Sequence, residues 1–354
     1  MKYVQVVAIF FLVILSCKKE HSPDLSSENE IKFQYITKIQ WHENQDSISL
    51  NSGGEALRFA KKDLPLKTAM VVPTSVIAYL DELDLTDKIT GVSQIDFIFN
   101  PEIHQNLKAN KIIEIGSFNE LFIEKILVSK PDVFITTSGP TLAKFHELLK
   151  REGINILYID EYEEPEPLAK AEYVKIFGKL FGKEKEADDL FKEIEKNYLE
   201  IQSKVKESST KNPAVIANQM YGDVWYMPGG KSFQAILFKD AGGDYLWSAD
   251  TSAGTLNLSF ESVFEKAHNA DIWMNAGDFP SKAALLATYP HYEWFAAFKS
   301  GNIYNWNKRK SPTGANDYFE TGTARPDWIL KDLAAIFHPE LFPGHELFFY
   351  ERLK

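Results

Sequence analysis

Aromatic and basic side chains gather in two segments of the C-terminal half of the chain. Tyr221, Trp225 and Tyr226 lie close together next to several glycines, and Trp306 stands shortly before the basic Arg309. Rigid aromatic rings suit the walls of a pocket for a large flat ligand, and an arginine suits an anionic group on such a ligand. The pattern predicts a binding site. The alternatives are rings that lie in the core and a basic loop that is simply solvated.

The chain lacks the motifs of common catalytic sites. It contains no GxSxG, HExxH, P-loop or glycine-rich dinucleotide fingerprint, and we predict no catalytic residue. A site for bare zinc or manganese would need the scattered His104, His146 and His291 to converge. The single cysteine excludes an intramolecular disulfide. These observations favour a ligand-binding protein without a resident metal over an enzyme.

The elements that must position these residues follow a regular alternation of short apolar runs and helical patterns. In the first half, strands are expected at 68–72, 89–92, 111–115, 131–136 and 154–159. A second, similar set begins at residue 214. Strands separated by helices indicate parallel sheets. The predicted fold class is α/β, with two α/β lobes at 67–164 and 209–354, each around a central sheet.

A long helical segment separates the two predicted lobes. Apolar residues recur at three- and four-residue spacing through 165–208, and a kink is expected at Gly182. We interpret this segment as an interlobe helical connector. Residues 31–66 alternate in short stretches around Gly53 and Gly54, which predicts an N-terminal β extension of two or three strands on the main body.

Composition limits the classes of function. The 354 residues are 44% hydrophobic, which is typical of a globular chain with room for two domains. Acidic residues outnumber basic ones, 50 against 39, and the formal net charge is −11. Sequence-independent nucleic-acid binding needs a cationic surface, so this charge argues against a DNA or RNA partner.

The N-terminus has the pattern of an export signal. Lys2 precedes an apolar run at 3–15 that is too short to span a bilayer comfortably. The sequence up to Cys17 resembles a bacterial lipobox, which implies a signal peptide at 1–16, lipidation of Cys17 and a flexible tether at 17–30. A plain signal peptide is the alternative. We expect a lipid-anchored protein of the cell envelope, on the periplasmic side or exposed at the surface.

Several motifs in order carry a family resemblance. They are Lys88-Ile89-Thr90-Gly91-Val92, Ile115-Gly116-Ser117, Glu124-Lys125-Ile126-Leu127, Lys130-Pro131-Asp132-Val133, Leu258-Ser259-Phe260-Glu261 and Arg325-Pro326-Asp327-Trp328. Over about 67–340, these motifs resemble the substrate-binding proteins of ABC transporters for ferric siderophores, haem and vitamin B12. The resemblance implies two lobes joined by a long helix, a ligand cleft between the lobes for a metal chelate, and no enzymatic activity.

The resemblance also implies a partner. Family members place one carboxylate on each lobe against an ABC permease dimer, and the matching positions are Glu124 and Glu261. A first-turn acid that is favoured only by the helix dipole is the alternative for Glu124. We expect a monomer that delivers its ligand to the permease.

Ligand contacts are expected beyond the carboxyl ends of the strands. The predicted contacts are Thr74, Ser75, Gln94, Phe97, Phe118, Ser138, Tyr221, Trp225, Tyr226, Trp306, Arg309 and Tyr318. The bound ligand is expected to be a ferric siderophore, haem or cobalamin, with no intrinsic cofactor. The alternatives are a zinc or manganese receptor of related fold, a metal-dependent enzyme of similar two-lobe architecture and a surface adhesion lipoprotein.

Overall fold

The computed structural model describes residues 29–354. The predicted signal peptide, Cys17 and nearly all of the predicted tether lie outside the described residues. The last two positions of that tether belong to strand β1 (Asn29–Ile31), because its backbone pairs antiparallel with β2 (Gln40–Glu43). Among the described residues, no helix is long and apolar enough to cross a membrane.

The N-terminal extension is an antiparallel sheet in the order β1-β2-β3-β4. A tight turn at Gly53 and Gly54, both with positive φ, joins β3 (Ser47–Ser52) to β4 (Glu55–Ala60), and a short 3₁₀ turn η2 (Lys61–Asp63) follows. Trp41, Ile48 and Leu50 are buried in the main hydrophobic core. The extension therefore folds as part of the body.

Two buried carboxylates attach the segment between β1 and β2 to the rest of the protein. Glu172 accepts hydrogen bonds from the backbone N–H groups of residues 34, 35 and 36 at 2.7–3.1 Å. Glu164 accepts those of Thr37 and Lys38 at 2.8 Å. Both carboxylates are almost fully buried, so these charge-assisted bonds hold the extension to the start of the interlobe connector.

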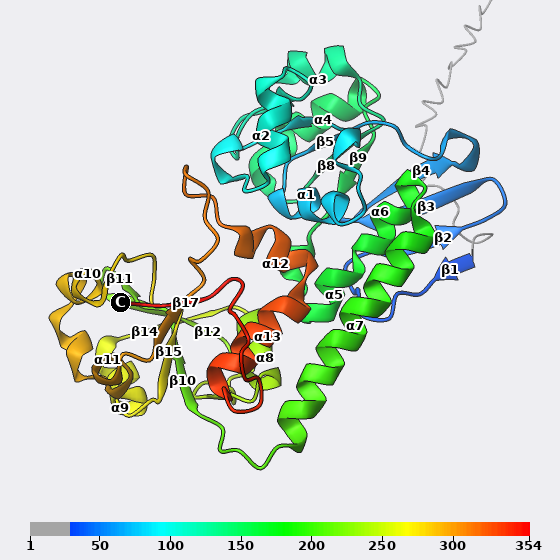
Figure 1. The fold of residues 1–354 in the computed structure, drawn as a ribbon. Coiled ribbons are helices and arrows are strands. Elements are labelled where there is room, and N and C mark those ends of the chain that lie inside the picture. The colour runs from blue at the N-terminus through cyan, green and yellow to red at the C-terminus, as the bar shows by residue number, and fades with distance from the viewer. Residues whose placement is uncertain (1–28) are drawn as a thin grey trace, which may run out of the picture.

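The first lobe contains a five-stranded parallel sheet in the order β7-β6-β5-β8-β9 (Figure 1). Its strands are β5 (Ala69–Val71), β6 (Ile89–Val92), β7 (Ile113–Glu114), β8 (Val133–Thr136) and β9 (Ile156–Tyr158). Its helices are α1 (Thr74–Asp81), α2 (Pro101–Lys108), α3 (Ile123–Ser129) and α4 (Ala143–Arg151), with 3₁₀ turns η3 (Thr86–Lys88), η4 (Ile95–Phe97), η5 (Pro140–Leu142) and η6 (Glu161–Glu163). The strands expected from the sequence are confirmed: β6 has the expected bounds, and the other four are shorter than expected.

The connector is helical but broken twice. It consists of α5 (Pro167–Glu172), α6 (Val174–Phe181) and α7 (Glu184–Glu207), the long green helix of Figure 1. The predicted break at Gly182 is confirmed: its φ of 75° is a left-handed conformation that ends α6. The second break, at Tyr173, was not indicated by the apolar spacing, which continues through it.

The second lobe contains a mixed sheet in the order β13-β10-β15-β16-β17. Its strands are β10 (Ala214–Ala217), β13 (Asp244–Tyr245), β15 (Ile272–Met274), β16 (Ile303–Asn305) and the antiparallel edge strand β17 (Glu351–Arg352). A three-stranded antiparallel sheet of β11 (Met220–Tyr221), β12 (Val224–Pro228) and β14 (Thr255–Leu258) adjoins it. The helical elements are α8 (Phe233–Asp240), α9 (Phe260–Ala267), α10 (Lys282–Thr288), η7 (Pro290–Trp294), α11 (Ala296–Ser300), η8 (Asp317–Phe319), α12 (Thr321–Ala324) and α13 (Pro326–Phe337).

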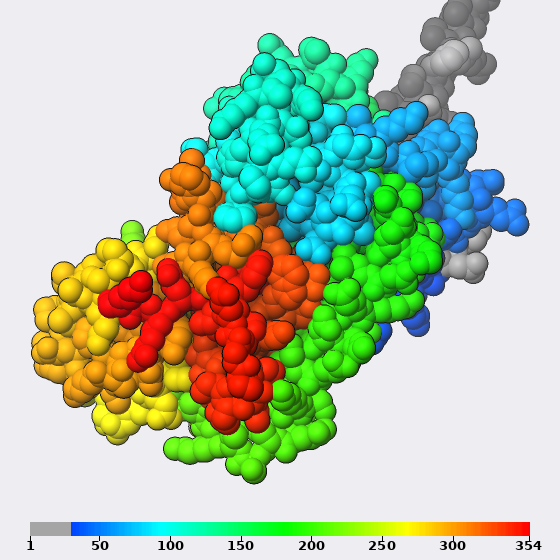
Figure 2. All heavy atoms as spheres, in the orientation of Figure 1, coloured from blue at the N-terminus to red at the C-terminus, as the bar shows by residue number. Residues whose placement is uncertain are grey.

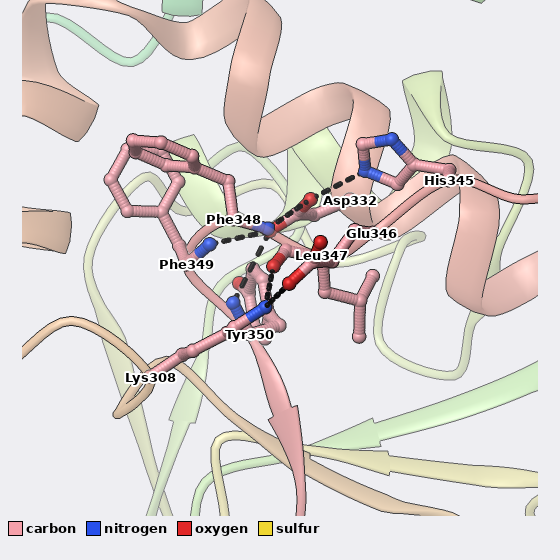
Figure 3. Close-up of polar contacts among 8 residues, drawn as sticks. All are labelled: Lys308, Asp332, His345, Glu346, Leu347, Phe348, Phe349 and Tyr350. Atoms are coloured by element: carbon pink, nitrogen blue, oxygen red, sulfur yellow. Dashed lines mark hydrogen bonds and ion pairs between the residues drawn. The ribbon is translucent and has the colours of Figure 1, made fainter.

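A buried aspartate fixes the C-terminal segment against α13 (Figure 3). The carboxylate of Asp332 accepts backbone N–H bonds from Phe348, Phe349 and Tyr350 at 2.7–3.2 Å, and it lies 2.7 Å from Nε2 of His345. Asp332 is fully buried, so these donors compensate its desolvation. This arrangement directs the chain into β17 and closes the edge of the sheet.

One segment of the second lobe crosses to the first lobe. Residues 311–325, orange in Figures 1 and 2, bring α12 against α1. The buried Glu320 accepts backbone N–H bonds from Phe99 and Asn100 at 2.8 and 2.9 Å. Arg325 pairs with Glu82 of α1 at 3.3 Å and with Asp327 at 2.8 Å. The two lobes are therefore joined by this segment as well as by the helical connector.

Candidate functional site

A cavity of about 690 Å³ lies between the two lobes and the crossing segment. Of the predicted ligand contacts, the lining residues include Thr74, Ser75, Gln94, Phe97, Phe118, Trp306 and Tyr318. In the first lobe, Thr74 follows β5, Gln94 follows β6 and Phe118 follows β7. In the second lobe, Trp306 follows β16. The cavity thus lies at the carboxyl ends of the parallel strands, where ligands of α/β lobes usually bind.

Aromatic rings from both lobes form the walls of the cavity. Phe97 and Phe118 are exposed by 60% and 57%, and their rings meet edge to face with centroids 5.7 Å apart. Opposite them, Trp306 stacks on the buried Tyr318 at 4.7 Å, and the exposed Phe319 contacts Trp306 at 5.3 Å. Exposed large apolar rings on two facing walls are unusual for a surface without a ligand.

The floor of the cavity holds buried polar groups. Ser75 donates its hydroxyl to Oε1 of Glu161 at 2.5 Å, and Nζ of Lys170 donates to the backbone carbonyl of Glu161 at 2.7 Å. Burial raises the pKa of Glu161 and lowers the pKa of Lys170. Within residues 29–354, Oε2 of Glu161 and Oε1 of the buried Gln94 have no hydrogen-bond partner. Both residues line the cavity.

The acidic and basic side chains that line the cavity are equal in number. Glu161 and Asp278 face Lys170 and Lys310, and none of the lining residues is an arginine. Asp278 is bound by Lys310 as an ion pair and accepts a hydrogen bond from the amide of Asn307 at 3.0 Å. The cavity therefore offers large apolar surfaces and hydrogen-bonding groups without an excess of positive charge.

Trp225 does not line the cavity, and the expectation that it faces the cleft is wrong. It is fully buried, donates its indole N–H to the carbonyl of Ala217 at 2.9 Å, and stacks on Trp273 at 5.5 Å. The segment at 219–230 contains a β-hairpin of β11 and β12, and alternation along β12 turns Trp225 inward and Tyr226 outward.

Four further residues of the predicted contact set lie outside the cavity. Tyr221 and Tyr226 are exposed on the hairpin, and Ser138 packs against the N-terminal extension near Gly53. Arg309 donates from Nε to the buried Asp317 at 2.5 Å and lies over the ring of Phe348 at 4.3 Å. Its guanidinium is committed to a structural ion pair, so the expectation that Arg309 reaches the ligand is not supported by its position.

Several other lining residues were not predicted from the sequence. Tyr162 belongs to η6, Lys170 to the first connector helix, and Phe233 to the start of α8. Gly322 and Ile329 come from the crossing segment and α13. The run of polar and acidic residues around 160–166 gave no signal for a cavity wall, and the contact between α12 and α1 has no local sequence signature.

A two-lobe α/β fold with a cavity at the strand ends has a counterpart among known families. The sequence model described as "Periplasmic binding protein" matches residues 71–310, which span both lobes and the connector. The chain belongs to the periplasmic binding protein family. The resemblance inferred from the motifs at 88–92, 115–133 and 258–261 is confirmed at this level.

Curated relatives of this periplasmic binding protein include lipoproteins. An uncharacterized lipoprotein of Methanocaldococcus jannaschii is 29% identical over 303 residues, which are 81% of this chain and 69% of the relative. An uncharacterized ABC transporter substrate-binding lipoprotein of Bacillus subtilis is 28% identical over 151 residues, 42% of this chain and 44% of the relative. Among solved structures, a possible iron-binding (periplasmic solute-binding) protein of Staphylococcus epidermidis superposes with a TM-score of 0.62 at 18% identity, covering 77% of this chain and 99% of that one.

The two predicted docking carboxylates of this periplasmic binding protein lie at equivalent places, one in each lobe. Glu124 stands in the first turn of α3 and Glu261 in the first turn of α9, and both are exposed. Hydrogen bonds from its own backbone N–H and from Ser259, the N-cap of α9, lower the pKa of Glu261. Both side chains therefore reach the surface of their lobes.

The three histidines considered for a zinc or manganese site lie apart. His104 on α2 contacts the carbonyl of Ile98 at 2.7 Å, His146 is buried beside Thr136, and His291 of the second lobe stacks on Trp294 at 4.0 Å. Within residues 29–354, no group of three or more His, Cys, Asp or Glu side chains is placed to hold a metal ion.

Proposed function

We propose that this protein is the extracytoplasmic receptor of an ABC importer and captures a metal chelate in the interlobe cleft. The observation that carries the proposal is the aromatic-walled cavity of about 690 Å³ at the strand ends of a periplasmic binding protein fold. Its walls suit a large, rigid chelate such as a ferric siderophore, haem or cobalamin. The iron-binding description of the Staphylococcus epidermidis structure supports this class of ligand.

Ligand capture is tested by equilibrium titration. The full-length chain, purified in mild detergent, is titrated with cyanocobalamin, hemin and representative ferric siderophores, and visible spectra and tryptophan fluorescence are recorded. Trp306 lies in the wall, so ligands that absorb near its emission should quench it. We expect saturable binding at micromolar concentration or below, about −8 kcal/mol. Absence of saturable binding by every chelate would contradict the proposal.

We further propose that Cys17 carries lipid, which tethers the receptor to the envelope, and that the receptor catalyses no reaction. The relatives named as lipoproteins support the anchor. The test is metabolic labelling with a fatty acid: the wild-type chain should incorporate label and remain in the membrane fraction. The Cys17→Ser variant should lose both properties, and retention of label would place the lipid elsewhere.

We propose that the receptor delivers its ligand to a permease dimer and docks on it through Glu124 and Glu261. One exposed carboxylate on each lobe can pair with basic residues of a two-fold partner and set its register. We expect the Glu124→Ala, Glu261→Ala double variant to lose uptake while keeping ligand affinity. Exposed acids nearby, Glu120 and Glu265, provide the matched control as a Glu120→Ala, Glu265→Ala variant. Equal loss of uptake in both variants would exclude specific docking.

A further inference from the structure

The polar floor of the cleft lacks donors for two buried acceptors. Oε2 of Glu161 and Oε1 of Gln94 make no hydrogen bond within the described chain, although both residues are more than nine-tenths buried and line the cavity. A buried acceptor without a partner destabilises the protein because it has lost its bonds to water. A ligand that supplies N–H or O–H donors at these two positions would compensate for that loss, whereas a ligand that carries only acceptors would not.

The backbone holds Gln94 in place for this role. Gln94 adopts a left-handed conformation with φ of 57°, and its own N–H donates to the carbonyl of Gly116 at 3.0 Å. The following 3₁₀ turn η4 carries Phe97 into the aromatic wall. A primary amide and an aromatic ring are thus presented together by one short turn. Left-handed residues other than glycine are uncommon and cluster at functional sites.

The two lysines of the cleft already have protein partners. Lys310 is paired with Asp278, while Lys170 is buried beside Glu161 and donates to its carbonyl. Arg309, just before the crossing segment, is bound to Asp317 and does not line the cavity. A ligand with several carboxylates or phenolates would enter without a free cation, and moving unpaired charges from water into a partly enclosed site is costly.

From these observations we infer that the cleft selects an uncharged, amide-bearing metal chelate over an anionic one. The inference rests on the proposed function and narrows its ligand class. Amide N–H groups satisfy Gln94 and Glu161, amide carbonyls can accept from the floor, and the flat apolar part of the chelate packs between Phe97, Phe118 and Trp306. Corrinoids with amide side chains and neutral ferric trihydroxamates on a peptide backbone share this chemistry.

The test compares four probes on the full-length chain. Cyanocobalamin and a neutral ferric trihydroxamate are the uncharged probes, and hemin and a ferric tricatecholate are the anionic ones. We expect at least one uncharged probe to bind about 30-fold more tightly than either anionic probe, equivalent to about 2 kcal/mol. An anionic probe that binds as tightly as both uncharged probes overturns this inference but leaves the proposed function intact. Failure of all four to bind contradicts the proposed function itself.

Two variants probe the named atoms. Gln94→Leu removes the buried acceptor and should weaken the preferred uncharged probe about tenfold, whereas Gln105→Leu on the exposed face of α2 should leave it unchanged. Asp278→Asn frees Lys310 and should shift the ratio of hemin to uncharged-probe affinity about tenfold toward hemin. Thermal unfolding checks that each variant is folded. Unchanged affinity in Gln94→Leu together with an unchanged ratio in Asp278→Asn would overturn the inference.

Discussion

Two aromatic segments of the second lobe have similar compositions and opposite roles. The hairpin at 219–230 and the segment at 306–319 both combine aromatic residues with glycine and charge. In the hairpin, pairing of β12 with β11 and β14 buries Trp225 and exposes Tyr221 and Tyr226 away from the cleft. The segment at 306–319 follows β16 toward the first lobe and belongs to none of the named strands. Trp306 and Phe319 on this segment line the cavity.

The difference teaches that strand pairing, more than composition, decides which rings meet a ligand. A ring on a paired strand is directed by two-residue alternation toward the core or toward solvent. A ring on a segment that spans two lobes is directed by the contacts at both of its ends, here β16 and Glu320. The predictions below separate these roles, beginning with the largest expected effect.

Replacing Trp225 tests the core role of the hairpin. Trp225→Ala removes a fully buried indole that stacks on Trp273 and bonds Ala217. We expect the free energy of unfolding to fall by about 3–5 kcal/mol, measured by urea denaturation. The preferred chelate should bind the folded variant with unchanged affinity. A large loss of affinity with little loss of stability would show that Trp225 contacts the ligand and does not serve the core.

Replacing Arg309 tests whether the basic cluster of the second segment is structural. In Arg309→Ala the fully buried Asp317 loses its ion-pair partner, and the variant should lose about 3 kcal/mol of stability. The double variant Arg309→Met, Asp317→Leu should recover much of this loss, because an unpaired buried charge is no longer present. A selective loss of ligand affinity in Arg309→Ala, with stability intact, would restore Arg309 as a ligand contact.

Replacing Trp306 tests the wall of the cleft. Trp306→Ala should weaken the preferred chelate by about 2 kcal/mol, roughly 30-fold, because it removes a ring that faces the ligand. The stability loss should be smaller than that of Trp225→Ala, since Trp306 is only partly buried. Isothermal titration gives the affinity and denaturation gives the stability. Equal effects of both tryptophans on both measurements would remove the distinction between the segments.

The anchor of the crossing segment predicts a pH dependence. Burial, together with the nearby Asp317 and Asp81, raises the pKa of Glu320 to about 8, against the lowering effect of the N–H bonds from Phe99 and Asn100. The folded state therefore binds this proton more tightly than the unfolded chain, where the usual value is 4.5. The stability from Glu320 is fully present below that unfolded pKa and is lost as pH rises through about 8.

We expect the Glu320→Gln variant to lose this part of the pH profile. Glutamine keeps the shape of the protonated carboxyl, so the fall in unfolding free energy between about pH 5 and pH 9 should shrink by about 1–2 kcal/mol. Denaturation series of both proteins across this range give the comparison. Parallel profiles for the two proteins would show that folding does not shift the pKa of Glu320.

Tyr221 provides the smallest expected effect. It is 81% exposed at the tip of the hairpin and lies outside the cavity. Tyr221→Ser should change stability by less than about 0.5 kcal/mol and leave chelate affinity unchanged. A clear drop in affinity would mean that the hairpin closes over the ligand, and the contrast between the two segments would then hold only for the unliganded protein.

The sequence predicts the fold and one side of the site well. Apolar runs and helix patterns locate the parallel strands. The residues that follow the carboxyl ends of these strands, namely Thr74, Ser75, Gln94, Phe97 and Phe118, line the cavity. On the side of the crossing segment, Trp306 and Tyr318 also line the cavity. Five predicted contacts lie outside it, and for two of these, Trp225 and Arg309, a buried polar partner eight residues away directs the side chain. The buried Ala217 carbonyl and the buried Asp317 carboxylate cannot be identified from local pattern.

The interlobe bonds of Glu320 and Arg325 have a consequence for the rate of ligand exchange. A wide opening of the lobes would have to break the N–H bonds of Phe99 and Asn100 and the Arg325–Glu82 pair together. We expect the proposed ligand to enter and leave past Phe97 and Phe118 instead, because both rings are exposed at the cavity. Residence time would then be governed by the motion of two side chains rather than by hinge opening, and enlarging or trimming these rings would tune it.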